Sequence, residues 1–501
     1  MNNYQDDKKG NNLSRRQFVS RTAAVVAGFT IIPGGIISAK GRIAPSDKLN
    51  IAGIGIGGMG RTNINNLKSE NIAALVDVDW AYAAKTFEAY PAAKKYTDYR
   101  KMFDEMKNSI DAVVIATADH THAIIASQAM KLGKHVYCQK PLTHSVYESR
   151  YLTELSNEKK IVTQMGNQGN SGPGIRDLCE WIWDGAIGEV KHVDTWTNRP
   201  IWPQGLERPT EVVEVPGTLN WDLFTGPAKF TPYNPIYTPW NWRGWWDYGT
   251  GALGDMACHI IDPVFKALKL KYPVKVQGSS TMVNTVSAPM AEIVTYKFPA
   301  RDNLPKVGMP EVTVKWYDGG LLPERPAGLP EGVILGRDGG GGALFHGTKG
   351  ILMCGVYAKD PILLPYDRMN TYVKPPQKLR RVGVENHEMD WARACKEGYD
   401  NVFAKGTEPS SNFNYSGPLN EMVVMGVVAV RLQDLRRELE WDGKNMKFTN
   451  ISDTDQIKVV TSDKFTIING DPKSDTKRET INAKSAAEEY IKHTYREGWS
   501  L

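Results

Sequence analysis

The chain has 501 residues, of which 41% are hydrophobic and 23% are charged, and its formal net charge is +5. This length can build two sizeable hydrophobic cores, so a single small domain is excluded. The sequence has no basic stripe typical of nucleic-acid binding and no long run of like charge. The five cysteines are scattered without a C-x-x-C pair, which favours buried free thiols over a disulfide framework.

The N-terminal segment has the pattern of an export signal. Residues 14–19, Ser-Arg-Arg-Gln-Phe-Val, precede an uncharged apolar stretch at residues 22–39. Paired arginines, a modest hydrophobic region and a small residue, Ala39, at its end are typical of a twin-arginine signal peptide. We therefore expect residues 1–39 to engage the twin-arginine translocase and the mature protein to be periplasmic. A retained membrane tether is the alternative, because Ile37 is not the small residue preferred before a cleavage site.

A glycine-rich segment follows the apolar run at residues 48–54. It reads Gly55-Ile56-Gly57-Gly58-Met59-Gly60. This is the G-x-G-x-x-G fingerprint of dinucleotide binding, placed between a strand-like run and a helix-like one. Gly55 permits a tight turn, Gly57 lets the backbone approach a pyrophosphate, and Gly60 allows close packing of helix on strand. Gly58 and Met59 complete the predicted cofactor-binding loop.

Asp77 ends the next apolar run, about twenty residues after the glycines. A carboxylate there can accept hydrogen bonds from a ribose 2′-hydroxyl and repels a 2′-phosphate. The three residues that follow, Val78, Asp79 and Trp80, include no Arg or Lys to receive that phosphate. The predicted cofactor is therefore NAD rather than NADP.

Short apolar runs alternate with helix-like stretches as far as residue 168. This alternation predicts an α/β fold with a doubly wound parallel sheet, the Rossmann type, over residues 48–168. The expected strands are residues 48–55, 71–78, 111–118, 134–139 and 160–166, and helices are expected at 81–90, 99–108 and 121–133.

Polar residues follow several of these strands. Ligands of such sheets bind outside the carboxyl ends of the strands, so these residues should converge on one site. The further cofactor-binding residues predicted at this edge are Thr117, His120, Gln139 and Gln168.

The sequence pattern changes after residue 168. A helix is predicted at 172–186, and strand-like segments at 190–198, 274–284, 292–300, 311–319 and 343–355 predict a large, mainly antiparallel sheet. A Pro/Gly-rich stretch, residues 319–342, should be a long surface loop, and helices are expected at 384–398 and 418–437. These segments define a second domain at 169–440. A C-terminal extension, 441–501, should pack on it with a small strand pair and a terminal helix at 483–497.

Half of the fourteen tryptophans fall between Trp196 and Trp246. Core packing is the usual role of tryptophan. Here, however, Trp242 and Trp245 lie beside Arg243 in a polar, glycine-rich segment. Flat aromatic faces next to hydrogen-bonding groups suit a sugar, so these three residues are predicted to bind substrate.

Asp255 and His259 are four residues apart, and in a helix they would share one face. A carboxylate one turn from an imidazole can orient it for general acid or base catalysis. An ordinary helix with an aspartate near its start has the same pattern, so the spacing alone leaves both readings open.

Five segments together resemble the Gfo/Idh/MocA family of oxidoreductases: GIGGMG, ALVDVD, DAVVIATADHTHA, GKHVYCQKPL and GALGDMACHIID. They occur in the family's order, and the resemblance covers roughly residues 48–435. It implies NAD- or NADP-dependent oxidation or reduction of a ring hydroxyl on a sugar or cyclitol. It also implies a second domain whose open sheet forms subunit contacts, hence a homodimer or homotetramer.

The resemblance also implies roles for three residues. Lys140 corresponds to the lysine of the family's Glu-Lys-Pro motif, which contacts substrate and nicotinamide. Asp255 and His259 correspond to its Asp-x-x-x-His pair, with His259 as proton acceptor. All three are therefore predicted to be catalytic and to bind substrate, and no metal site is expected. The sequence departs from the motif at Gln139, where glutamate is typical, which changes the charge beside Lys140.

Two other functions fit the same residues. An NAD-dependent glycosidase or lyase would oxidise a sugar transiently, eliminate a substituent and then reduce the product. A periplasmic sugar-binding protein without catalysis is the third reading. Export also predicts a tightly bound NAD that is recycled, because the envelope is not expected to hold a free NAD pool.

Overall fold

The structure is a computed structural model that describes residues 47–337 and 339–501, and in this part of the chain six parallel strands form the first sheet. Its strand order is β3-β2-β1-β4-β5-β6. The strands are β1 (Asn50–Ile54), β2 (Asn71–Val76), β3 (Lys94–Tyr96), β4 (Ala112–Ile115), β5 (His135–Cys138) and β6 (Thr163–Met165). Every pairing is parallel, as a doubly wound sheet requires.

Helices follow the strands of this sheet: α2 (Met59–Asn66), α3 (Trp80–Ala89), α4 (Tyr99–Met106), α5 (Asp119–Lys131) and α6 (Val146–Glu158). The predicted Rossmann fold is thus confirmed. The structure adds β3, whose residues Lys94, Lys95 and Tyr96 form no apolar run that a pattern search could detect. α6 begins with a capping box between Ser145 and Glu148, which satisfies two backbone N–H groups at its start.

A second, mixed sheet has nine strands among the described residues, in the order β13-β12-β11-β7-β10-β9-β8-β14-β15. The strands are β7 (Val190–Thr197), β8 (Lys275–Ser280), β9 (Glu292–Phe298), β10 (Val312–Tyr317), β11 (Gly341–Gly347), β12 (Gly350–Gly355), β13 (Ile362–Leu364), β14 (Leu439–Asp442) and β15 (Lys447–Phe448). Of these described strands only β7 and β10 pair in parallel, so the predicted mainly antiparallel sheet is confirmed. In the described residues between β10 and β11 the chain forms no helix or strand, as expected for a loop.

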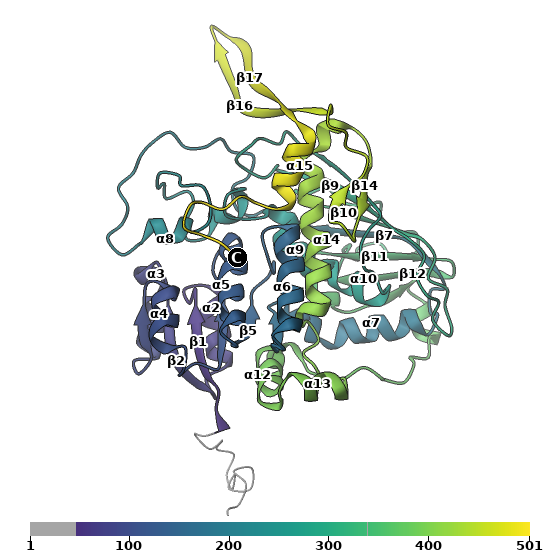
Figure 1. Ribbon diagram of the computed structural model, residues 1–501. Coiled ribbons are helices and arrows are strands. Elements are labelled where there is room, and N and C mark those ends of the chain that lie inside the picture. Colours follow the sequence, from purple (N-terminus) through teal and green to yellow (C-terminus); the bar gives the residue numbers. More distant parts are fainter. Residues whose placement is uncertain (1–46, 338) are drawn as a thin grey trace, which may run out of the picture. The chain divides into compact units, whose positions relative to one another are not determined.

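Some helices of the second half contact the strands of this sheet, and others contact the nucleotide-binding half (Figure 1). They are α7 (Pro173–Trp183), α8 (Trp221–Thr225), α9 (Gly251–Ile260), α10 (Asp262–Ala267), α11 (Arg368–Thr371), α12 (His387–Glu397), α13 (Tyr399–Lys405) and α14 (Phe413–Arg431). Short 3₁₀ turns lie at η3 (Gln168–Ser171), η4 (Asn241–Gly244), η5 (Val356–Ala358), η6 (Val384–Asn386) and η7 (Gln433–Leu435).

The helix α14 is central to this packing. It is buried almost all round and contacts α6 of the nucleotide-binding half as well as α9, β8 and β9. The sequence predicted a helix starting at Pro418, but α14 starts at Phe413, where the Asn412 side chain accepts from the Asn414 N–H. Pro418 therefore lies inside the helix, where the surrounding packing tolerates its missing N–H.

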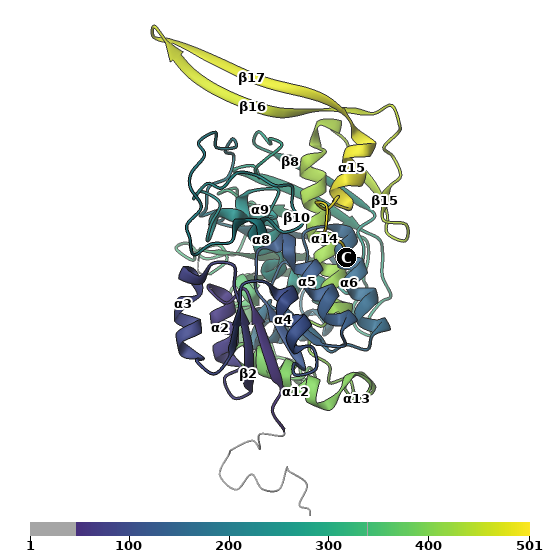
Figure 2. The same ribbon diagram turned by 60° about the vertical axis from the view of Figure 1, so that its left-hand side comes forward.

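The C-terminal extension is larger in structure than the predicted strand pair. Beyond β15, strands β16 (Gln456–Ile468) and β17 (Asp471–Asn482) form a long antiparallel hairpin, which extends away from the rest of residues 49–501 in Figures 1 and 2. α15 (Ala483–Ile491) contacts α6 and α14 and ends before the predicted residue 497. The last residues return to the nucleotide-binding half, where the Arg100 guanidinium lies 4.6 Å from the Trp499 ring.

Three further predictions concern thiols, the membrane and the leader. All five cysteines lie within the described residues and are buried and free, as expected. None of the described helices is long and apolar enough to cross a membrane. The twin-arginine leader lies outside the described residues, so that expectation stays a prediction.

Candidate active site

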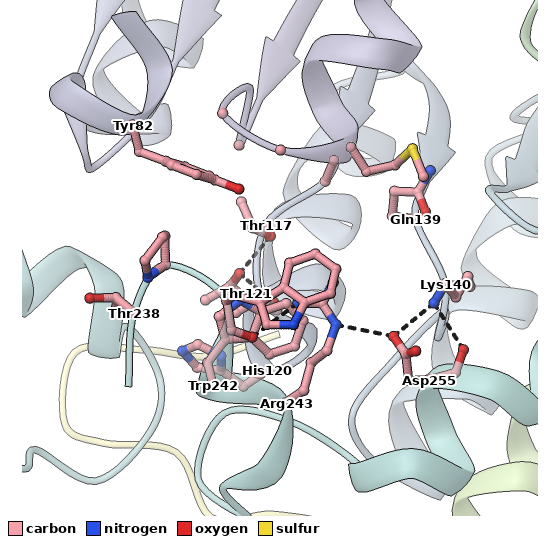
Figure 3. A pocket seen from close by; sticks show the side chains of 18 of the residues that line it. Tyr82, Thr117, His120, Thr121, Gln139, Lys140, Thr238, Trp242, Arg243 and Asp255 are labelled. Atoms are coloured by element: carbon pink, nitrogen blue, oxygen red, sulfur yellow. Dashed lines mark hydrogen bonds and ion pairs between the residues drawn. The ribbon is translucent and has the colours of Figure 1, made fainter. Parts of the chain in front are cut away.

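A cavity of about 660 Å³ lies at the carboxyl ends of β1, β2, β4 and β5, with residues of the second domain on its other side (Figure 3). This is the edge at which a doubly wound sheet binds its ligand. Most of the predicted site residues line it: Gly55, Gly57, Gly58, Met59, Asp77, Thr117, His120, Gln139, Lys140, Gln168, Trp242, Arg243, Asp255 and His259. The structure thus brings both halves of the predicted site together.

Two glycines are required by the backbone of the loop itself. Gly55 has φ +76°, and a Cβ there would lie 2.7 Å from the Ala116 carbonyl group. A Cβ at Gly60 would lie 2.0 Å from the Gly55 carbonyl oxygen. Gly60 does not line the cavity; it lets α2 pack closely on the end of β1, the packing role that the fingerprint predicts.

Tyr82 of α3 covers the middle of the loop and is a residue that sequence reasoning missed. A Cβ at Gly57 would lie 2.1 Å from its ring, and a Cβ at Gly58 would lie 2.8 Å from its hydroxyl. The tyrosine lines the cavity and reaches across it in Figure 3. Glycine at 57 and 58 therefore leaves room for an aromatic side chain over the backbone that would bind a pyrophosphate.

Asp77 lies under the same loop. One carboxylate oxygen accepts from the Ile56 and Gly57 N–H groups at 2.8 and 3.1 Å, and the other accepts from the Asp79 N–H at 3.0 Å. Burial raises the pKa of Asp77 to about 6, although these backbone hydrogen bonds oppose the shift. A carboxylate has about four acceptor positions, so Asp77 can hold the loop and still accept from a ribose hydroxyl.

His120 lines the cavity, but the structure corrects the expectation that its imidazole is available to a cofactor. Its Nε2 lies 2.9 Å from the Phe224 carbonyl oxygen, and its Nδ1 lies 3.3 Å from that of Tyr248. Burial lowers its pKa to about 4, so the ring is neutral at pH 7. Both nitrogens face backbone carbonyls, and His120 therefore joins the cavity wall to the second domain.

Thr117, a predicted cofactor contact, has a hydrogen-bond partner four residues along the chain. Its side-chain oxygen accepts a hydrogen bond from the Thr121 hydroxyl at 2.7 Å.

Gln139 belongs to a buried hydrogen-bond chain. Its amide donates to Asn63 Oδ1 at 2.9 Å, and the Asn63 amide donates to Glu388 Oε1 at 2.6 Å. Glu388 comes from α12 and is buried. A carboxylate at position 139 would face the Asn63 oxygen instead of donating to it, with a second buried carboxylate close by. The neutral amide is thus the residue that this local network accepts.

The carboxylate partner of Lys140 comes from the second domain. Lys140 Nζ donates to Asp255 Oδ1 at 2.8 Å and to the Asp255 backbone oxygen at 2.9 Å. Arg243 Nε donates to the same Oδ1 at 3.1 Å, and Figure 3 shows both contacts. Burial alone would raise the pKa of Asp255, but the two cations hold it well below its ordinary value. The carboxylate is therefore ionised and fixes both cations at the cavity wall.

This pairing differs from the expectation that the Asp255 carboxylate orients the His259 imidazole. Both residues lie on α9, as predicted, but among the described residues the Asp255 side chain makes its hydrogen bonds with Lys140 and Arg243. His259 lines the cavity, with Nδ1 buried and, within the described part of the chain, without a partner. Burial and the Lys140 charge keep the pKa of His259 well below 6.5. Its imidazole is therefore neutral at pH 7 and able to accept a proton.

Tryptophans flank the cationic side of the cavity. The Arg243 guanidinium lies 4.0 Å from the Trp240 ring and 4.3 Å from the Trp242 ring. Trp245, predicted to bind substrate, is 1% exposed, does not line the cavity and packs 4.8 Å from Tyr237. Its predicted role is therefore replaced by core packing. Trp240, which is 46% exposed and lines the cavity, takes its place.

Three more cavity residues escaped sequence reasoning. Arg199 follows β7, Trp499 lies at the C-terminus, and Tyr357 lies in η5 with its ring 4.7 Å from that of His259. Tyr357 has φ +62°, an uncommon backbone conformation for a residue other than glycine. No local pattern marks these positions, since each reaches the cavity only through the arrangement of distant segments.

A glycine loop on a Rossmann sheet, facing a lysine and a neutral histidine from two domains, defines a nucleotide-binding α/β protein. Two family models match the chain. Residues 49–167 match "Oxidoreductase family, NAD-binding Rossmann fold", and residues 189–300 match "Oxidoreductase family, C-terminal alpha/beta domain". Over these two stretches, which together span less than half of its length, the chain is similar to the NAD-binding Rossmann domain and the C-terminal α/β domain of the Gfo/Idh/MocA oxidoreductase family, in that order.

Similar proteins include named dehydrogenases. Levoglucosan dehydrogenase of Pseudarthrobacter phenanthrenivorans is 29% identical over 185 residues, which cover 36% of this chain and 38% of that protein. Myo-inositol 2-dehydrogenase of Thermotoga maritima is 25% identical over 178 residues, which cover 35% of this chain and 51% of that protein. The chain is thus aligned to about half or less of the length of either relative.

The fold also resembles solved structures. An inositol dehydrogenase homologue from Azotobacter vinelandii, complexed with NADH and myo-inositol, aligns with a TM-score of 0.51 at 14% identity. The alignment covers 79% of this chain and 98% of that one. This likeness concerns the fold, which in both cases joins a Rossmann domain to a second α/β domain.

Proposed function

We propose that this protein is an NAD-dependent oxidoreductase that acts on a ring hydroxyl of a sugar, glycoside or cyclitol. The observation that carries the proposal is the meeting of three groups at one cavity: the glycine loop, the Lys140–Asp255–Arg243 cluster and His259. The dehydrogenase names of the relatives support the same class of reaction.

The glycine loop fits the cofactor. Gly55, Gly57 and Gly58 line the cavity; a Cβ at Gly55 would meet the Ala116 backbone, and one at Gly57 or Gly58 would meet the Tyr82 side chain. Asp77 beneath the loop is the predicted ribose acceptor, and Gln168, which also lines the cavity, is a predicted cofactor contact. When bound, NAD supplies the hydride acceptor for oxidation of a carbinol.

The chain's own residues handle the proton and the developing charge. The neutral His259 imidazole can accept the hydroxyl proton. Two N–H groups of Lys140 donate to Asp255, which leaves the third to donate to the substrate oxygen and stabilise negative charge there. Asp255 acts through these cations, because it holds Lys140 and Arg243 in place.

The cavity wall favours a carbohydrate ring. Trp240 and Trp242 provide aromatic faces for the apolar C–H surface of a sugar, and Arg243 between them provides donors for its hydroxyls. Levoglucosan and myo-inositol, named for the relatives, are molecules of this kind. A panel of sugars, glycosides and cyclitols, incubated singly and in pairs with the full-length protein, should yield one product lighter by two hydrogen atoms together with a second substrate made heavier by two, by mass spectrometry. Release of an aglycone would favour the glycosidase or lyase reading, and binding without turnover would favour a sugar-binding protein.

NAD should bind more tightly than NADP by at least about tenfold, because a 2′-phosphate beside the Asp77 carboxylate places like charges together. Fluorescence titration of both cofactors measures the difference. Replacing Asp77 with serine should narrow it, while the isosteric Asp77→Asn variant tests whether charge or shape is responsible. Equal or tighter binding of NADP by the unaltered protein would contradict the assignment of Asp77.

The pH dependence of oxidation should follow His259. A base must be unprotonated to accept a proton, and burial lowers the pKa of His259 well below 6.5. Oxidation should therefore keep its rate as the pH falls from 8 through 6.5, and decline only at lower pH. The measurement is kcat/KM against pH in a constant-ionic-strength buffer series. An acidic limb at 6.5 or above would show that His259 is not the base or is not buried during turnover.

Export and retention of the cofactor form the last part of the proposal. We infer that residues 1–39 direct export of the folded, NAD-loaded protein to the periplasm. Tyr82 over the loop and Trp499 at the cavity wall support retention, because both would restrict the exit of a bound dinucleotide. A retained cofactor requires a reaction that returns the hydride, either to a second substrate or to the same sugar after elimination.

Protein purified from the envelope should therefore release near-stoichiometric NAD on denaturation, and its turnover should not need added NAD. Chromatography of the supernatant after denaturation measures the released NAD. Turnover assays of the dialysed enzyme measure whether added NAD is needed. A reporter fused to residues 1–45 should be exported, whereas its twin-lysine control should stay in the cytoplasm. Protein that is purified without NAD and needs soluble NAD for turnover would refute retention of the cofactor. A reporter that is not exported would refute export directed by residues 1–39.

A further inference from the structure

Three potential metal ligands meet on the second sheet, away from the cavity. His192 and Asp194 are on β7, and His346 is on the neighbouring strand β11. His192 and His346 face each other directly across the strand pair. The Nε2 atoms lie 2.8 Å and 2.9 Å from the two different oxygens of the Asp194 carboxylate. One ligand atom from each residue lies within 4.8 Å of the other two.

The environment of the carboxylate makes the cluster unusual. The Asp194 side chain is 9% exposed, whereas those of His192 and His346 are 31% and 33% exposed. Tyr317 is a further neighbour, and its hydroxyl donates to Oδ1 at 3.2 Å. A buried carboxylate thus lies between two imidazoles, and the partial exposure of both imidazoles leaves the cluster open toward solvent.

We propose that His192, Asp194 and His346 bind a divalent transition-metal ion, zinc(II) in the first instance. Two imidazoles and one carboxylate are a donor set that zinc takes, with the fourth tetrahedral position left to water. Hard ions such as Mg²⁺ and Ca²⁺ prefer all-oxygen sites and fit this set poorly.

A bound ion would require the three side chains to rearrange around it. Tetrahedral ligands about 2.1 Å from an ion lie roughly 3.4 Å apart, whereas each Nε2 now lies 2.8 or 2.9 Å from a carboxylate oxygen and the ligand atoms lie within 4.8 Å of one another. Each Nε2 must bind as a bare nitrogen, so the proton that it donates to Asp194 leaves to solvent, and the ring hydrogen of the neutral imidazole then lies on Nδ1, which takes it up from solvent. The Tyr317 hydroxyl, which donates to Asp194 Oδ1, then holds the carboxylate in its orientation toward the ion.

The site is separate from the proposed reaction. None of the three residues lines the cavity. β7 and β11 are antiparallel, and the ends that reach the cavity, at Arg199 and Gly340, are opposite to those that carry His192 and His346. A bound ion would link the two strands near the middle of the nine-stranded described sheet and leave NAD binding unaffected.

The test uses full-length protein without a histidine tag. The protein is stripped with a chelator, incubated with excess zinc, desalted and analysed by mass spectrometry for metal and by absorbance for protein. About one zinc per chain should remain. In a parallel experiment, cobalt(II) should produce visible d–d absorption of a four-coordinate site. Zinc that is lost on desalting, or a cobalt spectrum identical to that of the free ion, would overturn the proposal.

Variants locate the ion. His192→Gln and His346→Gln should each weaken zinc binding more than about tenfold, because even loss of an outer partner of a ligand costs that much. His135→Gln removes a partly buried histidine from β5 and should retain the zinc, which controls for general loss of imidazole. Equal NAD affinity in all variants shows that each is folded. Unchanged zinc binding in both ligand variants would refute the site.

Discussion

Replacing His259 with alanine should lower turnover by about 10²–10⁴-fold, the usual cost of removing a general base. The neutral imidazole lines the cavity, and among the described residues its Nδ1 is buried without a hydrogen-bond partner. Steady-state kinetics on the true substrate measures the loss. Because the histidine acts on the substrate hydroxyl, NAD affinity in a fluorescence titration should change little.

Two controls separate catalysis from folding in this prediction. His259→Asn keeps a polar side chain of similar size but cannot act as a base near neutral pH, so it should lose as much turnover as the alanine variant. His135→Gln, remote from the cavity, should keep full turnover. Near-normal turnover in either His259 variant would exclude His259 as the base. Loss of NAD binding together with loss of turnover would indicate that His259 has a structural role instead.

Replacing Lys140 with alanine should also reduce turnover by about 10²–10⁴-fold, since it removes both a charge stabiliser and one cation of the buried cluster. Asp255 would keep only Arg243 as a direct partner among the described residues, so the pKa of its carboxyl should rise. The rate loss should therefore come with a changed pH profile, which a simple loss of packing would not produce.

Lys140→Arg is the informative companion variant. It keeps the positive charge beside Asp255, so its fold and pH profile should match those of the unaltered protein. The wider guanidinium, however, places its N–H donors differently toward the substrate oxygen. We expect turnover to recover only in part. Full activity of Lys140→Ala would mean that the cluster serves structure alone, and the proton and charge assignments would both have to move elsewhere in the cavity.

The nucleotide-binding half could be predicted almost completely from sequence. Its apolar runs are contiguous, its strands are parallel, and the positions of Gly55 and Gly60 follow from backbone geometry within one turn. β3 was missed because its three residues carry no apolar pattern. The predicted catalytic residues Lys140, Asp255 and His259 line one cavity, and their catalytic roles stay predictions.

The contacts between those candidates could not be predicted. Helical spacing places Asp255 and His259 on one face of α9, but it does not say which partner the carboxylate takes. Lys140 arrives from the other domain and Arg243 from a preceding turn, and two cations are stronger partners than one neutral imidazole. The same limit explains Gln139, whose partners Asn63 and Glu388 come from separate segments.

The sequence by itself determined the glycine loop, the Rossmann alternation, the α9 spacing and the abundance of tryptophan near the second domain. Each depends on backbone conformation or burial periodicity within a few residues, which local sequence encodes. Only the tertiary structure decided that Trp240 faces the cavity while Trp245 is core, that Trp499 returns to the wall, and that His346 meets His192. Those outcomes depend on which distant segments pack together, and no local pattern in one chain contains that information.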